Sequence, residues 1–174
     1  SSPSTSVPMG RIGLLVIGLS LLVAAGCSDE HRRVMGPRTS IPSLTVAELL
    51  AAPDSLRVNG VTLKTEIYLY RDWMGDPERG TGLIAFVHLN GDPPGTLPAS
   101  VGAVYLWVLH GSDVWSETMT DQGIDPGRAD SPHLFRAQYG PRWDGTVDVV
   151  IGVRTSPTDV SLVLRKDVPI NQVY

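Results

Sequence analysis

Apolar and polar residues alternate with a period of two through most of the chain after residue 56, and this pattern limits the fold more than any other feature. In residues 61–70, Val61, Leu63 and Ile67 fall on one face of an extended segment, and polar residues fall on the other. The same alternation marks residues 83–89, 147–154, 160–164 and 168–173. Alternation of this kind is typical of β-strands that bury one face, and it differs from the 3.6-residue period of a helix.

Residues 101–109 are apolar on both faces, as is typical of a central strand. Residues 114–118 follow a Gly-Ser-Asp turn and are expected to pair with that strand as a hairpin, and residues 155–159 predict a second turn. The total is seven or eight short strands. We therefore predict an all-β fold, an antiparallel β-sandwich that is immunoglobulin-like in architecture, with a small closed barrel as the alternative.

One short helix is expected before the strands. Thr45 and Glu48 have the spacing of a capping box, and Pro53 is expected to end the helix. Two long connections follow, at residues 71–82 and 119–132. Connections of about twelve residues or more often carry function, so both are of interest.

An uncharged apolar run occupies residues 12–26, after Arg11 and before Cys27, the single cysteine of the chain. Residues 23–27 (VAAGC) resemble the lipobox of bacterial lipoproteins, although Ala24 stands where that family more often has Leu. In that family a peptidase cleaves before the cysteine, and the cysteine sulfur carries a diacylglycerol. The resemblance covers the first 27 residues and implies that Cys27 is a lipidation site.

A retained membrane helix is the other interpretation of this segment. Fifteen helical residues span only about 22 Å of the roughly 30 Å hydrocarbon core, but residues 8–10 with a snorkelling Arg11 extend the segment to the lower limit. We favour a retained single-span anchor over a cleaved lipoprotein signal, and both place the rest of the chain on a membrane. The residues expected to contact lipid or neighbouring helices are Leu14, Leu15, Ile17, Leu21 and Leu22.

These patterns divide the chain into a tail (residues 1–11), an anchor or signal (12–27), a tether (28–43) and a β-domain (44–174). Arg32, Arg33 and Arg38 follow the anchor closely, and a positive-inside count would keep the β-domain in the cytoplasm. The lipobox resemblance implies export instead. We expect the β-domain on the periplasmic, extracytoplasmic side of a bacterial membrane.

Charge and cysteine content exclude several classes of function. The 174 residues contain 14 Lys and Arg against 18 Asp and Glu, a net charge of −4, which argues against a nucleic-acid binder that depends on a basic surface. A single cysteine excludes an intramolecular disulfide and a cysteine-based zinc site. The four histidines (His31, His88, His110 and His133) have no metal-ligand spacing.

The sequence also lacks the common signatures of catalysis. It has no nucleophile elbow, phosphate-binding loop or dinucleotide fingerprint. Asp121, Asp125 and Asp130 lie in one acidic segment but lack the spacing of a calcium loop, so they are interpreted as solvated charges. We expect no enzyme activity, no catalytic residue, no bound metal and no cofactor.

Aromatic and arginine side chains are the remaining candidates for function, because Trp, Tyr and Arg are enriched where proteins bind one another. The expected partner contacts are Trp73, Tyr68, Tyr70, Arg71, Arg142 and Trp143. Covering the edges of the sandwich is the alternative role for these side chains.

The leading hypothesis is a non-catalytic accessory subunit that is anchored in the membrane and docks its β-domain onto a larger membrane-protein complex, for example a bacterial photosynthetic or respiratory complex. A small-molecule ligand is not expected under this hypothesis. One alternative is a free lipoprotein that binds carbohydrate or peptide through aromatic loops. Another is a hydrolase whose site the sequence does not reveal.

Overall fold

The computed structural model describes residues 40–72, 81–125, 127, 128, 130 and 132–173, which belong to a compact unit spanning Thr39–Tyr174. Cys27, the anchor residues and the tether up to residue 39 lie outside the described residues, as does Trp73. Within the described ranges, no helix has the length and apolar character needed to cross a bilayer.

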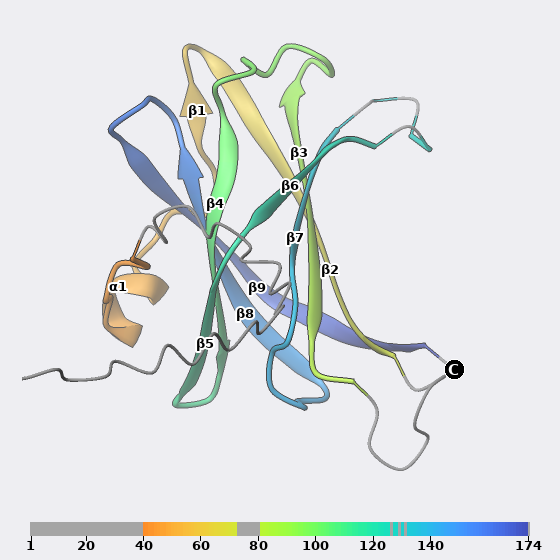
Figure 1. The fold of residues 1–174 in the computed structure, drawn as a ribbon. Coiled ribbons are helices and arrows are strands. Elements are labelled where there is room, and N and C mark those ends of the chain that lie inside the picture. Colours follow the sequence, from red (N-terminus) through yellow and green to blue (C-terminus); the bar gives the residue numbers. More distant parts are fainter. Residues whose placement is uncertain (1–39, 73–80, 126, 129, 131, 174) are drawn as a thin grey trace, which may run out of the picture. The chain divides into compact units, whose positions relative to one another are not determined.

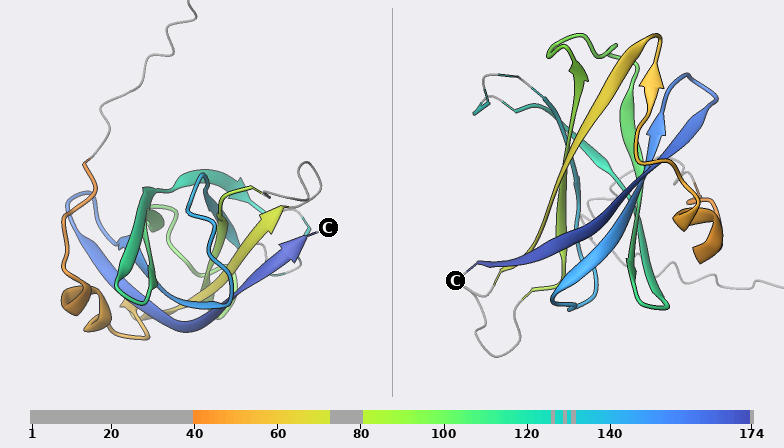
Figure 2. Two further views of the ribbon diagram at one scale, coloured as in Figure 1. Left: turned by 90° about the horizontal axis from the view of Figure 1, so that it is seen from below. Right: turned by 180° about the vertical axis from the view of Figure 1, so that it is seen from behind.

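Strands dominate the described part of the chain (Figure 1). They are β1 (Arg57–Val58), β2 (Val61–Asp72), β3 (Ile84–Asp92), β4 (Gly102–His110), β5 (Asp113–Thr118), β6 (Thr120–Ile124), β7 (His133–Ala137), β8 (Thr146–Arg154) and β9 (Val160–Val173). All nine belong to one sheet in the order β5-β4-β8-β9-β2-β3-β7-β6, with β1 attached to β2. The sheet curls into a half-barrel, as the end-on view in Figure 2 shows.

The long strand β9 joins the two halves of the sheet. Up to Pro169 it pairs with β8 in antiparallel fashion, and from Ile170 to Val173 it pairs with β2 in parallel. The β8–β9 register shifts next to Asp148, and Asp167 has a φ of 56° there. A bulge of this kind bends a strand, so β9 can serve both halves.

The predicted β-rich fold with one short helix is thus confirmed, but a sandwich of two separate sheets is not. The sheet is continuous through β9, and one of its pairings is parallel where antiparallel pairing alone was expected. Opposite β9, the chain passes from β5, which pairs with β4, to β6, which pairs with β7. At this point the Met119 N–H donates to the Val104 carbonyl at 3.0 Å.

Three strands were not foreseen. Strand β1 has only two residues, too few to show an alternation. Strand β6 lies inside residues 119–132, which were predicted to be a loop, and all five of its residues are exposed, so no alternation marks it. Strand β7 has only five residues, including His133 and Arg136, and it was missed because its apolar pattern is short. Strands β6 and β7 are positioned by pairing with distant strands, which the local sequence does not reveal.

The helix α1 (Val46–Leu50) forms where the sequence predicts it. The Thr45 side chain accepts a hydrogen bond from the Glu48 N–H at 3.2 Å, and the Glu48 carboxylate accepts one from the Thr45 N–H at 2.7 Å, which completes the capping box. Leu49 of this helix is fully buried in a cluster with Trp107 and Leu164. The helix therefore covers the β4–β8–β9 part of the sheet from outside the main core.

The main core fills the inside of the curl. It is built from the inward faces of the strands, with Leu63, Leu69, Ala85, Val87, Leu89, Leu106, Val108, Phe135, Val149, Ile151 and Val163 among its members. Side chains of β2 and β3 that alternate with these residues point away from the core. This alternation creates the outer surface on which the candidate site lies.

Candidate functional site

The outer surface of β2, β3 and β7 carries a row of aromatic rings. The strand register places Tyr68 opposite Phe86, and Phe86 opposite Arg136. The Tyr70 and Phe86 rings stack with centroids 5.7 Å apart and planes 10° from parallel. The Arg136 guanidinium lies 5.5 Å from the Phe86 centroid, a cation–π distance. We call Tyr68, Tyr70, Phe86 and Arg136 the aromatic face.

The aromatic face is ordered by its own contacts. Tyr68 makes an edge-on contact with His88, with centroids 5.4 Å apart, and its hydroxyl donates to the Glu66 carboxylate at 3.1 Å. Tyr68 nevertheless remains 44% exposed. The Arg136 guanidinium is positioned over the Phe86 ring. Its Nε has no hydrogen-bond partner among the described residues.

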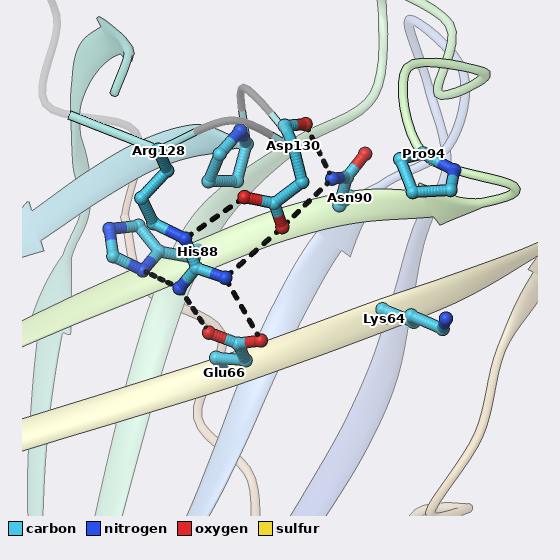
Figure 3. Close-up of a pocket in the computed structure, with 8 residues that line it drawn as sticks. Lys64, Glu66, His88, Asn90, Pro94, Arg128 and Asp130 are labelled. Atoms are coloured by element: carbon cyan, nitrogen blue, oxygen red, sulfur yellow. Dashed lines mark hydrogen bonds and ion pairs between the residues drawn. The ribbon is translucent and has the colours of Figure 1, made fainter. Parts of the chain in front are cut away.

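A polar hollow of about 150 Å³ lies beside the aromatic face on the same strands (Figure 3). Strand β2 contributes Lys64 and Glu66, and β3 contributes His88 and Asn90. The hollow is completed by residues from two connections, Pro94, Arg128, Asp130 and Pro132.

Arg128 is the centre of the side-chain network around the hollow. Its Nη1 and Nη2 donate to the two oxygens of Glu66, the latter at 3.3 Å. Its Nε and Nη2 donate to the two oxygens of Asp130 at 3.0 and 3.1 Å, and Nη1 lies 3.5 Å from His88 Nδ1. The guanidinium therefore joins the connection between β6 and β7 to the outer surface of β2 and β3, as Figure 3 shows.

Asn90 fixes the other side of the hollow and is almost completely buried. Its Nδ2 donates to the Asp130 carbonyl at 2.8 Å, and its Oδ1 accepts the N–H groups of Gly91 and Gly95 at 2.8 and 3.0 Å. One amide side chain thus ties β3 to the connection that follows it and to the connection between β6 and β7.

The network shifts the ionisation of its members. The hydrogen bonds from Arg128 lower the pKa of Glu66 and the pKa of Asp130, and they raise the pKa of Arg128. Two further contacts lie at the margin, the ion pair of Lys64 with Asp92 at 3.3 Å and an approach of His88 Nε2 to an Asp125 carboxylate oxygen at 3.3 Å. Because their pKa values are lowered, the Glu66 and Asp130 carboxyls that line the hollow are both ionised at neutral pH.

Of the six expected partner contacts, Trp73 lies outside the described residues, and the other five do not gather in one place. Tyr68 and Tyr70 lie together on the aromatic face. Arg71 is only 4% exposed and faces Asp144, so its guanidinium is placed to support the fold rather than to reach a partner. Trp143 stacks on His110 at 5.2 Å and packs partly against the core, whereas Arg142 beside it is exposed.

The residues that sequence reasoning missed include Lys64, Glu66, Phe86, Asn90, Arg128 and Arg136. Arg128 reaches Glu66 across 62 residues of sequence and His88 across 40, so no local pattern links them. The available signal was a lone arginine between Asp125 and Asp130 in an otherwise acidic segment.

The carboxylates of Asp121, Asp125 and Asp130 in the acidic segment do not converge on one point. Asp121 and Asp125 each accept a backbone N–H two residues further on, from Gly123 and Gly127, and Asp130 binds Arg128. Among the described residues, no group of three or more His, Cys, Asp or Glu side chains is arranged to hold a metal ion.

Comparison with known proteins adds no relative to this description. No protein-family model matches the chain, and no curated protein and no solved structure matches it.

Proposed function

We propose that this chain is a non-catalytic accessory subunit of a bacterial membrane-protein complex. The N-terminal segment holds the chain on the membrane, and the β-domain docks onto its partner on the extracytoplasmic side through the aromatic face. The observation that carries the proposal is the row formed by Tyr68, Tyr70, Phe86 and Arg136 on the outside of the sheet.

Both the residue types in this row and the rigidity of their side chains favour protein docking. Tyr and Arg are enriched at the residues that dominate binding energy, and rigid side chains lose little conformational entropy when they bind. Here the Tyr70 and Phe86 rings stack on each other, and Tyr68 is restrained by His88 and Glu66. The face is therefore preorganised before any partner arrives.

Membrane attachment would allow a weak contact with the partner to be sufficient for docking. Residues 12–27 provide the apolar segment, and Cys27 provides a thiol for lipid attachment in the lipobox interpretation. A tethered domain meets a neighbouring membrane protein at a high effective concentration, so that a weak docking surface can be occupied most of the time. This reasoning joins the N-terminal segment and the aromatic face in one function.

Copurification from native membranes tests the docking step. The tagged full-length chain is extracted with detergent, and the subunits that accompany it in stoichiometric amount are identified by mass spectrometry. A photo-crosslinking residue in place of Tyr68 must then label one of those same subunits. The double variant Tyr68→Ala/Tyr70→Ala should reduce their recovery at least about tenfold, a loss of roughly 1.4 kcal/mol or more in binding free energy.

Tyr139→Ala is the matched control, because Tyr139 is a tyrosine that is 85% exposed and does not belong to the aromatic face. It should leave recovery unchanged. Purification of the wild-type chain alone, or equal losses in both variants, would contradict docking through the aromatic face.

Membrane attachment needs its own measurement. Intact mass of the purified chain distinguishes a cleaved, diacylated chain that begins at Cys27 from a full-length chain. The variant Cys27→Ser should abolish the mass of the cleaved, diacylated form, and it should change the mass of a full-length chain only by the exchange of sulfur for oxygen. Wild-type chain found wholly in soluble fractions would contradict the anchoring part of the proposal.

A further inference from the structure

We infer that the polar hollow beside the aromatic face binds one unit of a neutral carbohydrate. This inference does not rest on the proposed docking function, because the hollow and the aromatic face are lined by different residues. It rests on the charge balance, the hydrogen-bonding capacity and the size of the hollow.

The lysine, arginine and acidic side chains that line the hollow sum to no net charge. Lys64 and Arg128 contribute two positive charges, and Glu66 and Asp130 contribute two negative charges. Two more carboxylates, Asp92 and Asp125, lie just outside and pair with Lys64 and His88. These carboxylates disfavour an anion. Each carboxylate is also already bound by Arg128, Lys64 or His88, so a cation would have to displace one of these partners.

Arg128 is not available to capture an anionic ligand. A guanidinium has five N–H donors, and those of Arg128 are directed at Glu66, Asp130 and His88 in five contacts. An incoming phosphate or carboxylate would have to displace a carboxylate that is already bound through two oxygens. A ligand that leaves this network intact is favoured instead.

The network still has hydrogen-bonding capacity on its other side. A carboxylate can accept about four hydrogen bonds. Glu66 accepts two from Arg128 and one from Tyr68, and Asp130 accepts two from Arg128 and one from Asn90. Lys64 uses one of its three donors on Asp92. The hollow thus offers fixed acceptors and a donor at once, which suits hydroxyl groups that both donate and accept.

Size and shape agree with a single sugar ring. A volume of about 150 Å³ corresponds to roughly five water molecules, well below the space that a drug-sized ligand needs. Pro94 and Pro132 give the hollow apolar walls for the C–H groups of a ring. In Figure 3, Pro94 and Lys64 lie at the opposite end of the hollow from Arg128 and His88, so a ring between them would meet both groups.

Titration of the full-length chain with defined probes tests the inference. The chain is kept in a detergent that has no sugar headgroup, and the probes are the methyl glycosides of glucose, galactose and N-acetylglucosamine. Binding is followed by saturation-transfer NMR and by the amide shifts of Gly91 and Gly95, whose N–H groups bind Asn90. At least one glycoside should bind with a Kd on the order of millimolar and move both amides.

Lys64→Trp should block the hollow and weaken that binding at least about tenfold. Lys64 is an exposed strand residue, so the substitution leaves the core untouched. Lys166→Trp is the matched control, because it changes the same residue types at another exposed strand position that does not line the hollow. It should bind the glycoside as the wild type does.

Three outcomes would overturn the inference. One is that no glycoside in the panel moves the two amides. Another is that inorganic phosphate, citrate or Ca²⁺ moves them at lower concentration than any glycoside, which would make the hollow an ion site. The third is that both tryptophan variants lose binding equally. None of these outcomes bears on docking through the aromatic face, which is tested by copurification.

Discussion

Arg71 Nη1 donates to both oxygens of the Asp144 carboxylate, at 2.8 and 3.0 Å, in an ion pair that spans 73 residues of sequence. Arg71 Nε also donates to the Thr81 carbonyl at 3.3 Å, and the Gln172 side chain donates to Asp144 at 3.2 Å. The pair therefore joins β2, β9 and the connection before β8 within the parallel pairing of β2 and β9, where Arg71 lies opposite Gln172.

Asp144→Ala should destabilise the fold, because it removes the carboxylate that faces an almost completely buried guanidinium. Breaking a buried pair typically costs about 3–5 kcal/mol, but Asp144 is 54% exposed and water can partly replace it, so we expect about 1–3 kcal/mol. Urea unfolding followed by tryptophan fluorescence measures the change. Asp113→Ala, at an exposed strand end, should change stability by less than about 0.5 kcal/mol. Equal effects of the two substitutions would show that the pair is not structural.

Arg128→Leu should reduce the sensitivity of the fold to acid. Arg128 is the main cause that lowers the pKa of Glu66 and the pKa of Asp130 below their ordinary values of 4.5 and 3.8. Carboxyls with a depressed folded-state pKa stabilise the protein above the unfolded-state pKa, and this stability is lost as the pH falls through the folded-state pKa. The stability difference between wild type and variant should therefore be present at pH 7 and shrink below about pH 4.5.

The measurement is urea unfolding at a series of pH values from 7 down to 3. Arg142→Leu removes an exposed arginine outside the network and should leave the acid profile of the wild type unchanged. Some acid sensitivity should persist in Arg128→Leu, because hydrogen bonds from Thr45 also lower the pKa of Glu48. A difference between wild type and Arg128→Leu that stays constant with pH would contradict the role assigned to the network.

Thr45→Ala should destabilise the β-domain by about 1 kcal/mol, the usual cost of removing an N-cap oxygen. The helix α1 has only five residues, so it depends on its cap and on the burial of Leu49. Thr45→Ser keeps a hydroxyl that can accept the Glu48 N–H and should retain most of the stability. Thermal unfolding of the two variants side by side measures the difference, and equal losses would mean that the hydroxyl is not the stabilising group.

Local patterns were sufficient to predict the helix and most of the strands, but not the short strands β1, β6 and β7 or the closure into one sheet. The alternation in residues 61–70 and the Thr45–Glu48 spacing are properties of neighbouring residues, and both predicted the observed element. The path of β9 depends on a bulge at Asp167 and on pairing with a strand about a hundred residues away. The sequence pattern predicted two strands separated by the charged residues 165–167, but the structure has one continuous strand there.

The candidate site was less predictable for the same reason. Tyr68 and Tyr70 were identified because they alternate with core residues on a single strand. Phe86 and Arg136 complete the aromatic face only through the β2–β3–β7 register, and Arg128 reaches the hollow from a connection predicted to be a solvated loop. Arg71 was assigned to a partner by residue type, but its position in the strand turns it toward Asp144.

Gly82→Ala should be more damaging than its small change in volume suggests. The chain before β3 and the connection before β8 lie against each other through two hydrogen bonds, Leu83 N–H to Pro141 O at 3.1 Å and Gly140 N–H to Leu83 O at 3.0 Å. A Cβ on Gly82 would lie only 2.1 Å from the Gly140 carbonyl oxygen, a backbone atom that cannot move without breaking these bonds. We expect a loss of about 1–3 kcal/mol in the free energy of unfolding, measured with urea.

Gly127→Ala, whose Cβ would meet only the flexible Asp125 side chain at 3.3 Å, is the control and should cost less than about 0.5 kcal/mol. Unchanged stability in Gly82→Ala would mean that the two segments do not approach this closely in solution.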